Sequence, residues 1–479
     1  MLRSCCVYGA GILCVLLLIA GIAMALTQVF QKLINNTIKE QVVLENGTEA
    51  FSVFQNPPPP VYMQFYFFNL TNPAEVLNGD RPAVLQIGPY TYREYRPKEE
   101  VKFLDNGTRV EAFNPKTYVF QPNMSRGSED DIVRTVDIPV VTVMEKFKDT
   151  FSVKRIISDL MIANGIGIFR TFRVGDLLWG YEDPLLKIIK HVVEMDDHFG
   201  LFYKKNATDD GDYIFFTGKQ NYQDFARIDE WNGQSTLNWW STEGCNRING
   251  TDGASFHPVI TKTEKLYIFS SDLCRSIYAQ YESDVSVRGV PGFRFVPPSE
   301  VFANRTINPD NAGFCVPAGN CLGSGLLNVS VCKEGAPIIM SSPHFYQADD
   351  KFVQDVFGMN PNKEEHETVI DVNPLTGMLL RGAKRVQVNV YLHQIQGFSQ
   401  TGKIQTLVFP VMYLNESVLI DEESAKKLYA VVNEANVIIN IPFIVISVGI
   451  LLGVIFIVFM CRQQTPPSTE AERQPLISS

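Results

Sequence analysis

Two long apolar runs lie near the ends of the chain, and polar and apolar positions are mixed between them. Residues 438–460 hold no charged side chain, and a helix of this length spans about 34 Å, enough to cross a bilayer core. Residues 5–27 form the second run, behind the short segment 1–4. A cleaved signal peptide with its site near Ala25 is the alternative, but its apolar part has only about 7 to 15 residues. The pattern therefore favours two membrane spans.

Residues 28–437, between the two spans, predict a globular region rich in strands. Residues 386–393 alternate strictly and predict a strand with one apolar face. Turn residues separate the predicted strands, which favours an antiparallel sheet or barrel over a βαβ fold. Aromatic and β-branched clusters predict strands at Val61–Phe68, Thr117–Phe120, Ile138–Val143, Tyr213–Thr217, Leu266–Phe269, Phe293–Val296, Val386–His393 and Ile404–Phe409.

Helical spacing of apolar residues appears in three places. Residues 28–44 continue the first apolar helix, and Asp421–Asn436, with its acidic first turn, leads into the second span. Residues 144–195 predict a helical hairpin inserted in the strand-rich region, made of Met144–Ile168 and Asp176–Val193. The hairpin is either a lid packed on the core or a protein-binding surface.

Composition and charge exclude several classes of function. The chain of 479 residues carries a net charge of −10 and has no basic stripe, which argues against binding of nucleic acid. It lacks a phosphate-cradling glycine loop, a Gly-x-Ser-x-Gly elbow and a His-Glu-x-x-His pair, so an enzyme such as a two-span ecto-nucleotidase is disfavoured. The acidic clusters 209–212 and 364–366 resemble ordinary surface loops, and no metal or cofactor is predicted. A two-span channel is also disfavoured, because the spans lack polar faces.

All ten N-x-S/T sequons lie between the two spans, which predicts that this region faces the lumen or the cell exterior. Asn35 lies close to the first span, where a membrane would hinder its use. The sequons predicted to carry sugar are Asn46, Asn69, Asn106, Asn123, Asn206, Asn249, Asn304, Asn328 and Asn415.

Five cysteines lie in the same region, and an odd number in an oxidising compartment allows at most two disulfides. Cys315 and Cys321 are close enough in sequence to pair locally, which leaves Cys274 with Cys332 and leaves Cys245 unpaired. Cysteines in or beside the spans serve either as small packing residues or as lipidation sites. These are Cys5, Cys6, Cys14 and Cys461.

The tail, residues 461–479, carries the pattern of a sorting signal. Leu476 and Ile477 would fill an apolar pocket of a clathrin adaptor, while Glu472 meets a basic patch. Pro475 discourages helix and keeps the pair extended. A chance Leu-Ile pair in a polar tail is the alternative.

Several long blocks of the sequence resemble the class B scavenger receptors, and the resemblance covers essentially the whole chain. The blocks are Gln64–Asn69, Gly88–Glu94, Leu177–Tyr181, Gly313–Cys332, Pro343–Tyr346 and Asn373–Gly377. The resemblance implies an α+β fold, with an antiparallel β-barrel-like ectodomain, an apical helical bundle and the same two disulfides. It also implies a tunnel through the barrel that carries cholesterol or phospholipid.

Within that family, the tail and residues 409–417 are most similar to a lysosomal member. This implies a protein of the lysosomal and late endosomal membrane that travels through the endoplasmic reticulum and Golgi. It further implies a receptor that escorts β-glucocerebrosidase on its apical helices and releases it in acid. The alternative is a lipid or lipoprotein receptor, or a lipid exporter, without the escort role.

Residues of the hairpin carry the expectations about cargo. The first apical helix of the lysosomal member has a histidine associated with pH sensing, whereas the corresponding residues 145–151 have none. His191, in the second predicted helix, is the candidate pH switch. The four-residue spacing of Gly449 and Gly453 allows a homo-oligomer. The predicted cargo-binding residues are Phe151, Ile156, Ile157, Leu160, Leu186 and Ile189.

Overall fold

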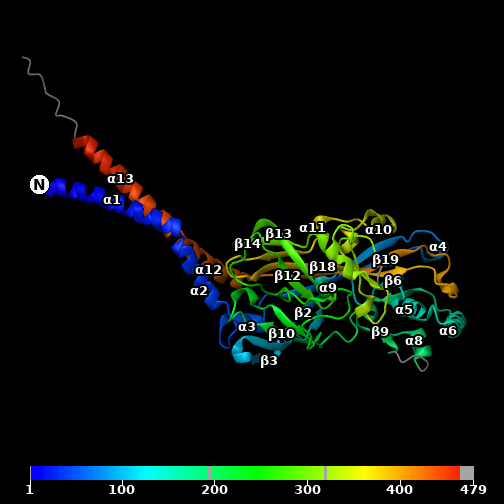
Figure 1. Cartoon of the computed structure of the whole chain (residues 1–479). Coiled ribbons are helices and arrows are strands. Elements are labelled where there is room, and N and C mark those ends of the chain that lie inside the picture. Colours follow the sequence, from blue (N-terminus) through cyan, green and yellow to red (C-terminus); the bar gives the residue numbers. More distant parts are fainter. Residues whose placement is uncertain (1, 191–195, 318–320, 464–479) are drawn as a thin grey trace, which may run out of the picture. The chain divides into compact units, whose positions relative to one another are not determined.

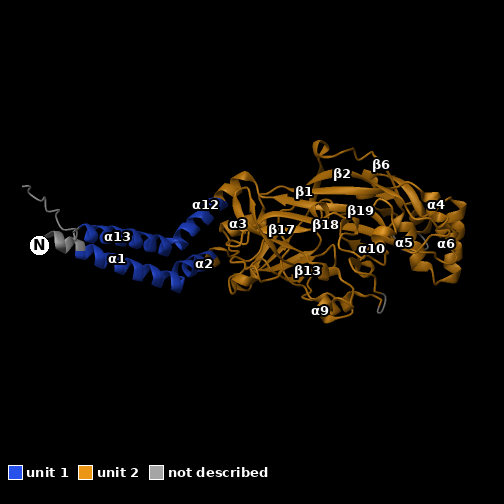
Figure 2. Ribbon diagram, turned by 90° about the horizontal axis from the view of Figure 1, so that it is seen from above, with its two compact units in different colours: residues 1–38, 428–479 blue, residues 39–427 orange. Residues whose placement is uncertain are grey.

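The computed structural model describes residues 2–190, 196–317 and 321–463. The chain forms two compact units (Figures 1 and 2). Unit 1 combines residues 1–38 and 428–479, and unit 2 holds residues 39–427. Each unit is therefore described separately below.

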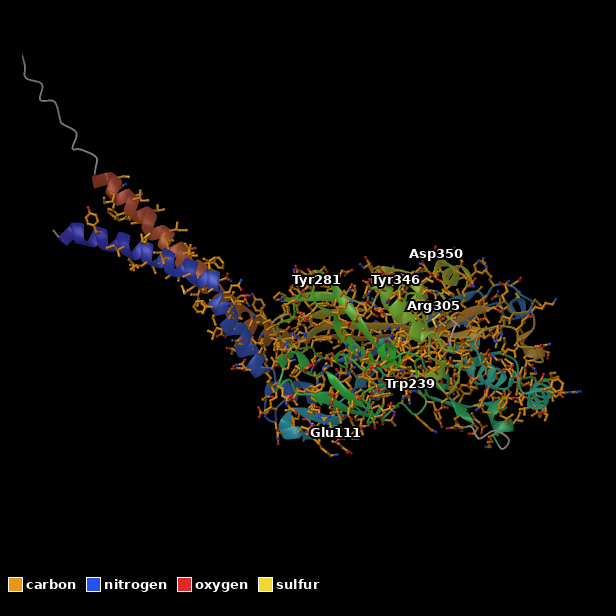
Figure 3. All side chains as sticks on the ribbon, viewed as in Figure 1. Glu111, Trp239, Tyr281, Arg305, Tyr346 and Asp350 are labelled. Carbon is orange, nitrogen blue, oxygen red and sulfur yellow. A yellow bond between two sulfur atoms is a disulfide. The ribbon has the colours of Figure 1, made fainter. Side chains whose placement is uncertain are left out.

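Two apolar helices make up most of unit 1. They are α1 (Leu2–Thr27) and α13 (Ile441–Gln463), and each is long and apolar enough to cross a membrane. The side chains drawn on them in Figure 3 are almost entirely carbon. Shorter helices adjoin them in sequence, namely α2 (Val29–Gln41) and α12 (Glu422–Ile439).

The second apolar helix begins three residues later than predicted. Helix α12 ends at Ile439, and α13 begins at Ile441 with Pro442 in its first turn. A proline fits the first turn of a helix because its missing N–H would have no intrahelical partner there. Helix α1 likewise does not run on without interruption, since Gln28 has a φ of 52° and separates it from α2.

Glycines bring α1 and α13 close together within the chain. A Cβ placed on Gly21 would lie 2.6 Å from Cγ1 of Ile446, so only glycine fits this approach. Gly449 faces Leu18, and its carbonyl accepts a hydrogen bond from the thiol of Cys14 at 3.1 Å. The glycine spacing predicted to allow an oligomer is thus used to pack two helices of one chain.

Unit 2 is built on an 11-stranded antiparallel sheet, which confirms the predicted fold class. Along its main path the strands are β12 (Leu266–Ser270), β13 (Arg275–Val287), β14 (Val290–Val296), β17 (Val369–Val372), β18 (Leu379–Leu392), β19 (Leu407–Leu419), β1 (Val61–Leu70), β2 (Val84–Tyr95) and β5 (Thr117–Phe120). Off this path, β15 (Leu326–Asn328) pairs with β16 (Ile338–Ser341), which pairs with β18.

Three smaller sheets complete the strands of the described residues. One has the order β11 (Ile228–Trp231), β10 (Asp212–Phe216), β4 (Arg109–Phe113) and β3 (Glu99–Leu104). The other two are the pair β6 (Ile132–Val136) with β7 (Phe169–Arg173), and the pair β8 (Tyr181–Glu182) with β9 (His198–Phe199).

Short helices occupy both ends of unit 2. Figures 1 and 2 both show α5 and α6 at the end opposite α3. The helices are α3 (Glu49–Gln55), α4 (Pro73–Leu77), α5 (Ile138–Phe147), α6 (Phe151–Ala163), α7 (Val174–Trp179), α8 (Pro184–Ile189), α9 (Glu243–Asn246), α10 (Asp350–Gln354) and α11 (Lys363–His366).

The region predicted as a two-helix hairpin, residues 144–195, is more broken than expected. It contains α5 to α8, with β7 and β8 between them. Gly180, at φ 133°, ends α7, and Asp183 followed by Pro184 starts α8. The predicted strand at 138–143 is also wrong, because Asp137 caps that segment and Pro139 sits in its first turn, so it begins helix α5.

Strand β18 departs from the prediction in its polar face. The alternation predicted one apolar face, but both faces are buried over most of residues 386–392. Gln387 and Asn389 are fully buried, and the amide of Gln387 donates to Oδ1 of Asn389 at 2.7 Å. Asn389 donates in turn to the carbonyl of Ile339 at 2.9 Å. On this face, hydrogen bonds within the protein replace hydrogen bonds to water, and they offset the free-energy cost of burying the polar side chains.

Two buried histidines stack against each other beside this row. The rings of His344 and His366 lie 4.4 Å apart at 18°, and both side chains are buried. Nδ1 of His344 accepts the backbone N–H of Asn360 at 3.0 Å, and Nδ1 of His366 accepts that of Asn362 at 2.8 Å. Each ring is therefore held in its neutral form. Burial lowers the pKa of each histidine to about 4, and His366 further lowers that of His344.

These histidines should make unit 2 less stable in acid. Above pH 6.5 they are neutral in both the folded and unfolded chain; as the pH falls toward 4, only the unfolded chain takes up protons. The free energy of unfolding should therefore drop by about 3 kcal/mol for each imidazole over this range. Urea unfolding followed by tryptophan fluorescence at pH 7, 5.5 and 4 measures the drop.

The matched variants are His366→Gln and, as control, His198→Gln at an exposed histidine. The His366→Gln protein should lose much less stability between pH 6.5 and 4 than the wild type, whereas His198→Gln should follow the wild type. Equal losses in all three proteins would contradict the assignment.

Candidate functional site

The helices α5 and α8 are anchored at their first turns by buried carboxylates. Asp137 accepts the N–H of Val140, and Asp183 accepts those of Leu185 and Leu186. Nη1 of Arg170 lies 3.4 Å from Asp183 and 3.7 Å from Asp137, so one guanidinium joins both caps. Burial raises the pKa of both carboxyls. This arrangement fixes the direction of the two helices.

The predicted cargo-binding residues divide into exposed and buried sets. Phe151 is 76% exposed and Ile156 is 60% exposed, both on α6. Ile162, on the same helix, is 60% exposed and was missed by the sequence analysis because hydrophobic spacing alone does not show which face points outward. Leu160 is half-buried. We call the three exposed residues, Phe151, Ile156 and Ile162, the apical face.

The remaining three predicted cargo-binding residues are part of the core. Ile157 is 3% exposed, Leu186 is 4% exposed and Ile189 is 2% exposed. Their helical spacing reflects packing of α6 and α8 on the core, so in this conformation they cannot contact a partner. The prediction for these residues was wrong.

A histidine contacts the first apical helix from another part of the chain. Nε2 of His393, just after β18, lies 3.0 Å from Oε2 of Glu145 on α5. Lys148 pairs with the same carboxylate. The contact with His393, followed by Lys148, holds the pKa of Glu145 below its usual range. The other candidate switch, His191, lies outside the described residues.

The sequons differ in how accessible their asparagines are. Asn46, Asn106, Asn123 and Asn206 are exposed. Asn415 lies on β19 between two strands and donates its amide to Oε1 of Gln64 at 2.9 Å, so a sugar at that nitrogen would displace this hydrogen bond. The half-buried asparagines of the remaining predicted sequons are Asn69, Asn249, Asn304 and Asn328.

The two disulfides in the structure are the expected pairs. Cys274 is bonded to Cys332, and Cys315 to Cys321. Cys245 is buried with a free thiol that donates to the carbonyl of Asp310 at 3.3 Å.

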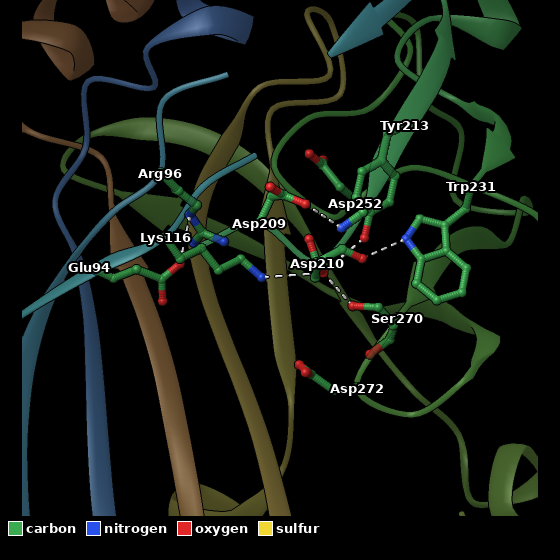
Figure 4. Close-up of polar contacts among 12 residues, drawn as sticks. Glu94, Arg96, Lys116, Asp209, Asp210, Tyr213, Trp231, Asp252, Ser270 and Asp272 are labelled. Carbon is green, nitrogen blue, oxygen red and sulfur yellow. Dashed lines mark hydrogen bonds and ion pairs between the residues drawn. The ribbon is translucent and has the colours of Figure 1, made fainter. Parts of the chain in front are cut away.

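A group of charged side chains gathers within unit 2, from segments that are far apart in sequence (Figure 4). Strands β2, β18 and β19 contribute some of them, and turns between strands contribute the others. We call this group the charged cluster. Its members are Glu94, Arg96, Lys116, Asp210, Asp272, Lys333, Lys384 and Glu416.

Glu94 lies at the most buried end of the charged cluster. Its side chain is 1% exposed, and Nε of Arg96 lies 3.6 Å from Oε1. Arg96 instead donates through Nη1 to Glu416 at 2.7 Å, and Glu416 is the cross-strand partner of Lys384, with Nζ at 3.5 Å. Burial opposes ionisation of Glu416, but Arg96 and Lys384 outweigh it and lower its pKa to about 2. Burial raises the pKa of Glu94, whose two oxygens have no hydrogen-bond partner among the described residues.

Asp210 occupies the middle of the charged cluster and is firmly oriented. Its Oδ2 accepts hydrogen bonds from the hydroxyls of Tyr213 at 2.9 Å and Ser271 at 2.5 Å. The indole of Trp231 donates to its backbone carbonyl at 3.0 Å. Nζ of Lys116 lies 3.6 Å from Asp210 on the other side, as Figure 4 shows.

A disulfide holds together the segments that form the more exposed end of the charged cluster. Asp272 is 54% exposed and receives a hydrogen bond from Lys384 at 2.5 Å. The attraction of Lys384 holds the pKa of Asp272 well below its usual range. The Cys274–Cys332 bond ties the turn of Asp272 to the segment of Lys333, which explains why residues so distant in sequence act on each other. Burial lowers the pKa of Lys333.

The acidic segments considered as metal sites have other roles. Asp210 belongs to the charged cluster, and His366 is stacked on His344. Among the described residues, the group spaced closely enough to share a metal ion is Asp196, Asp197 and His198 at the surface. Asp196 and Asp197 already pair with lysines, which accounts for the group without an ion. The sorting signal, Glu472, Leu476 and Ile477, lies outside the described residues.

Comparison with known proteins assigns nearly the whole chain to one family. The model of the CD36 family matches residues 12–460. Lysosome membrane protein 2 of Rattus norvegicus is 51% identical over 99% of this chain and 100% of its own length, and that of Homo sapiens is 51% identical over 99% of each chain. Scavenger receptor class B member 1 of Sus scrofa is 35% identical over 94% of this chain and 88% of its own length. The chain is therefore a member of the CD36 family, a lysosomal scavenger-receptor-like membrane protein.

Proposed function

We propose that this chain is a transport receptor that binds β-glucocerebrosidase in its lumen-facing unit and releases it in acid. The observation that carries the proposal is the apical face on α6. Three large apolar side chains, Phe151, Ile156 and Ile162, are each at least 60% exposed on one helix of 13 residues. They share the solvent side of α6 with Ser152, Arg155 and Asp159, and large apolar side chains exposed on a helix suit recognition of a protein partner.

Release in acid would act through the contact between His393 and Glu145. Histidine is the side chain best suited to a switch between pH 7 and 5, and His393 shares the Glu145 carboxylate with Lys148. The attraction between His393 and Glu145 would act on α5 from outside that helix. Helix α5 in turn contacts both α6 and α8. The contact with His393 reaches α5 from outside, because α5 contains no histidine of its own.

We further propose that unit 2 carries lipid, either cholesterol or phospholipid, through its interior. The relatives named as class B scavenger receptors support this part of the proposal. A lipid or lipoprotein receptor, or a lipid exporter, without cargo escort is the alternative. The chain would reach the lysosomal and late endosomal membrane through the endoplasmic reticulum and Golgi.

The apical face can be tested with purified full-length protein in a neutral detergent and β-glucocerebrosidase at pH 7. Ile156→Asp should weaken binding about ten- to a hundredfold, since burial of one large aliphatic side chain contributes about 1.5 to 3 kcal/mol. The matched control is Ile307→Asp, at an isoleucine that is 65% exposed outside the apical helices. It should bind as the wild type does.

The same preparation tests release. Wild-type binding should weaken at pH 5, and the weakening should be smaller in His393→Gln. No binding by the wild type at either pH would reject the escort role and favour the lipid alternative. Equal loss in Ile156→Asp and Ile307→Asp would reject the apical face as the contact surface.

We also propose that the tail binds clathrin adaptors through Leu476 and Ile477, with Glu472 meeting a basic patch. Replacing both Leu476 and Ile477 by alanine should shift the protein from lysosomes to the cell surface, because the apolar anchor of the signal is removed. Surface biotinylation and lysosomal co-localisation measure the shift. The control Ser478→Ala with Ser479→Ala should leave delivery unchanged, and unchanged delivery of the Leu476 and Ile477 variant would contradict the proposal.

A further inference from the structure

The charged cluster brings charged side chains into the interior of unit 2, and its exposed fractions fall to 1% at Glu94. Removing charges from water is expensive, and a buried ion pair often contributes less to stability than apolar residues of the same volume would. Glu94 shows this cost most clearly, since it is 2% exposed and neither of its oxygens accepts a hydrogen bond among the described residues. A buried carboxyl group without a hydrogen bond needs a physical explanation, and a ligand supplies one.

The bases of the charged cluster have unused hydrogen-bond donors. Within the described part of the chain, Arg96 donates one hydrogen bond, from Nη1 to Glu416, although a guanidinium carries five N–H groups. Lys116 approaches Asp210 only at 3.6 Å. Among the residues that the structure describes, the ammonium group of Lys333 has no hydrogen bond or ion pair within 4.0 Å. These unused donors all belong to the charged cluster.

The protonation state of Glu94 determines whether the charged cluster is neutral or positively charged. With all carboxyls ionised, the four acids and four bases of the charged cluster balance. Burial raises the pKa of Glu94 against the opposing influence of Arg96, Lys116 and Lys384, while Glu416 acts in the same direction as burial. Once Glu94 takes up a proton, the cluster carries one excess positive charge, and Glu94 gains an O–H that can donate.

Access to the cluster is graded along its length. The exposed fraction of the side chain rises from 1% at Glu94 to 23% at Lys116, 33% at Lys384 and 54% at Asp272. A group approaching from the side of Asp272 would reach the more exposed Lys384 and Lys116 before the buried Glu94. The disulfide at Cys274 and Cys332 fixes the outer part of this path.

From this geometry we infer that the charged cluster is a binding site for a phosphate group, which receives hydrogen bonds from Lys116 and Lys333 and is held more tightly when Glu94 is protonated. Charge-assisted hydrogen bonds from guanidinium and ammonium groups are the usual means of holding phosphate oxygens. The phosphate comes either from a lipid headgroup or from free phosphate; only the lipid source rests on the proposed lipid carriage. Acid strengthens binding, because it protonates Glu94.

Inorganic phosphate is the first probe, titrated calorimetrically at pH 7 and pH 5 into the full-length protein in a neutral detergent. The wild type should bind more tightly at pH 5. Lys333→Gln should weaken binding about tenfold at pH 5, because a charged donor is lost. The control is Lys102→Gln, at a lysine that is 62% exposed on β3, and it should bind as the wild type does.

Glu94→Gln separates the effect of Glu94 from protonation of the probe itself. Glutamine is neutral at every pH and can donate, so this variant should bind phosphate at pH 7 more tightly than the wild type and show less strengthening in acid. A Glu94→Gln protein with the pH profile of the wild type would overturn the role of Glu94. Absence of phosphate binding at both pH values, or equal binding by Lys333→Gln and Lys102→Gln, which indicates an adventitious ion only, would overturn the site.

A short-chain phosphatidic acid distinguishes the two sources of phosphate. Competition between dihexanoyl phosphatidic acid and phosphate, lost in Lys333→Gln, supports a lipid headgroup as the ligand. Phosphate binding without such competition supports the site and overturns the lipid source. Cholesterol has no phosphate, so its binding in the same preparation tests the proposed lipid carriage independently of the charged cluster.

Discussion

The fold of unit 2 depends on the pairing of its last strand, β19, with β18 on one side and β1 on the other. The eight residues from Leu407 to Leu414 are all buried, so this part of β19 is covered on both faces. The ladder aligns Val61 with Val418 and Lys384 with Glu416. The first and last strands of unit 2 are therefore neighbours, and every other strand of the large sheet is added outward from this pair.

The same pairing places both candidate functional features on one scaffold. Strands β18 and β19 supply Lys384 and Glu416 to the charged cluster, while the segment after β18 supplies His393 to helix α5. The disulfide between Cys274 and Cys332 adds the outer part of the cluster. Polar groups that would destabilise an isolated strand are tolerated here because hydrogen bonds and ion pairs accompany them into the core.

The sequence predicted those features that follow from local patterns. Strands at 61–68 and 117–120 were predicted from aromatic and β-branched residues, and the family was predicted from long blocks of residues. Local patterns failed at 138–143, where the cap at Asp137 favours helix, and at β18, whose polar face is buried. The charged cluster could not be predicted, because its members meet only through strand register and a disulfide. The contact of His393 with α5 was missed for the same reason.

Hydrogen exchange of the full-length protein in a neutral detergent at pH 7 tests the central claim most directly, namely that the β18–β19–β1 ladder is the rigid base of unit 2. Backbone amides exchange slowly where only global unfolding exposes them. The amides of β1, β18 and β19 should exchange slowest in the unit, and those of the apical helix α6 should exchange faster through local opening. Exchange of β19 as fast as that of α6 would contradict the account.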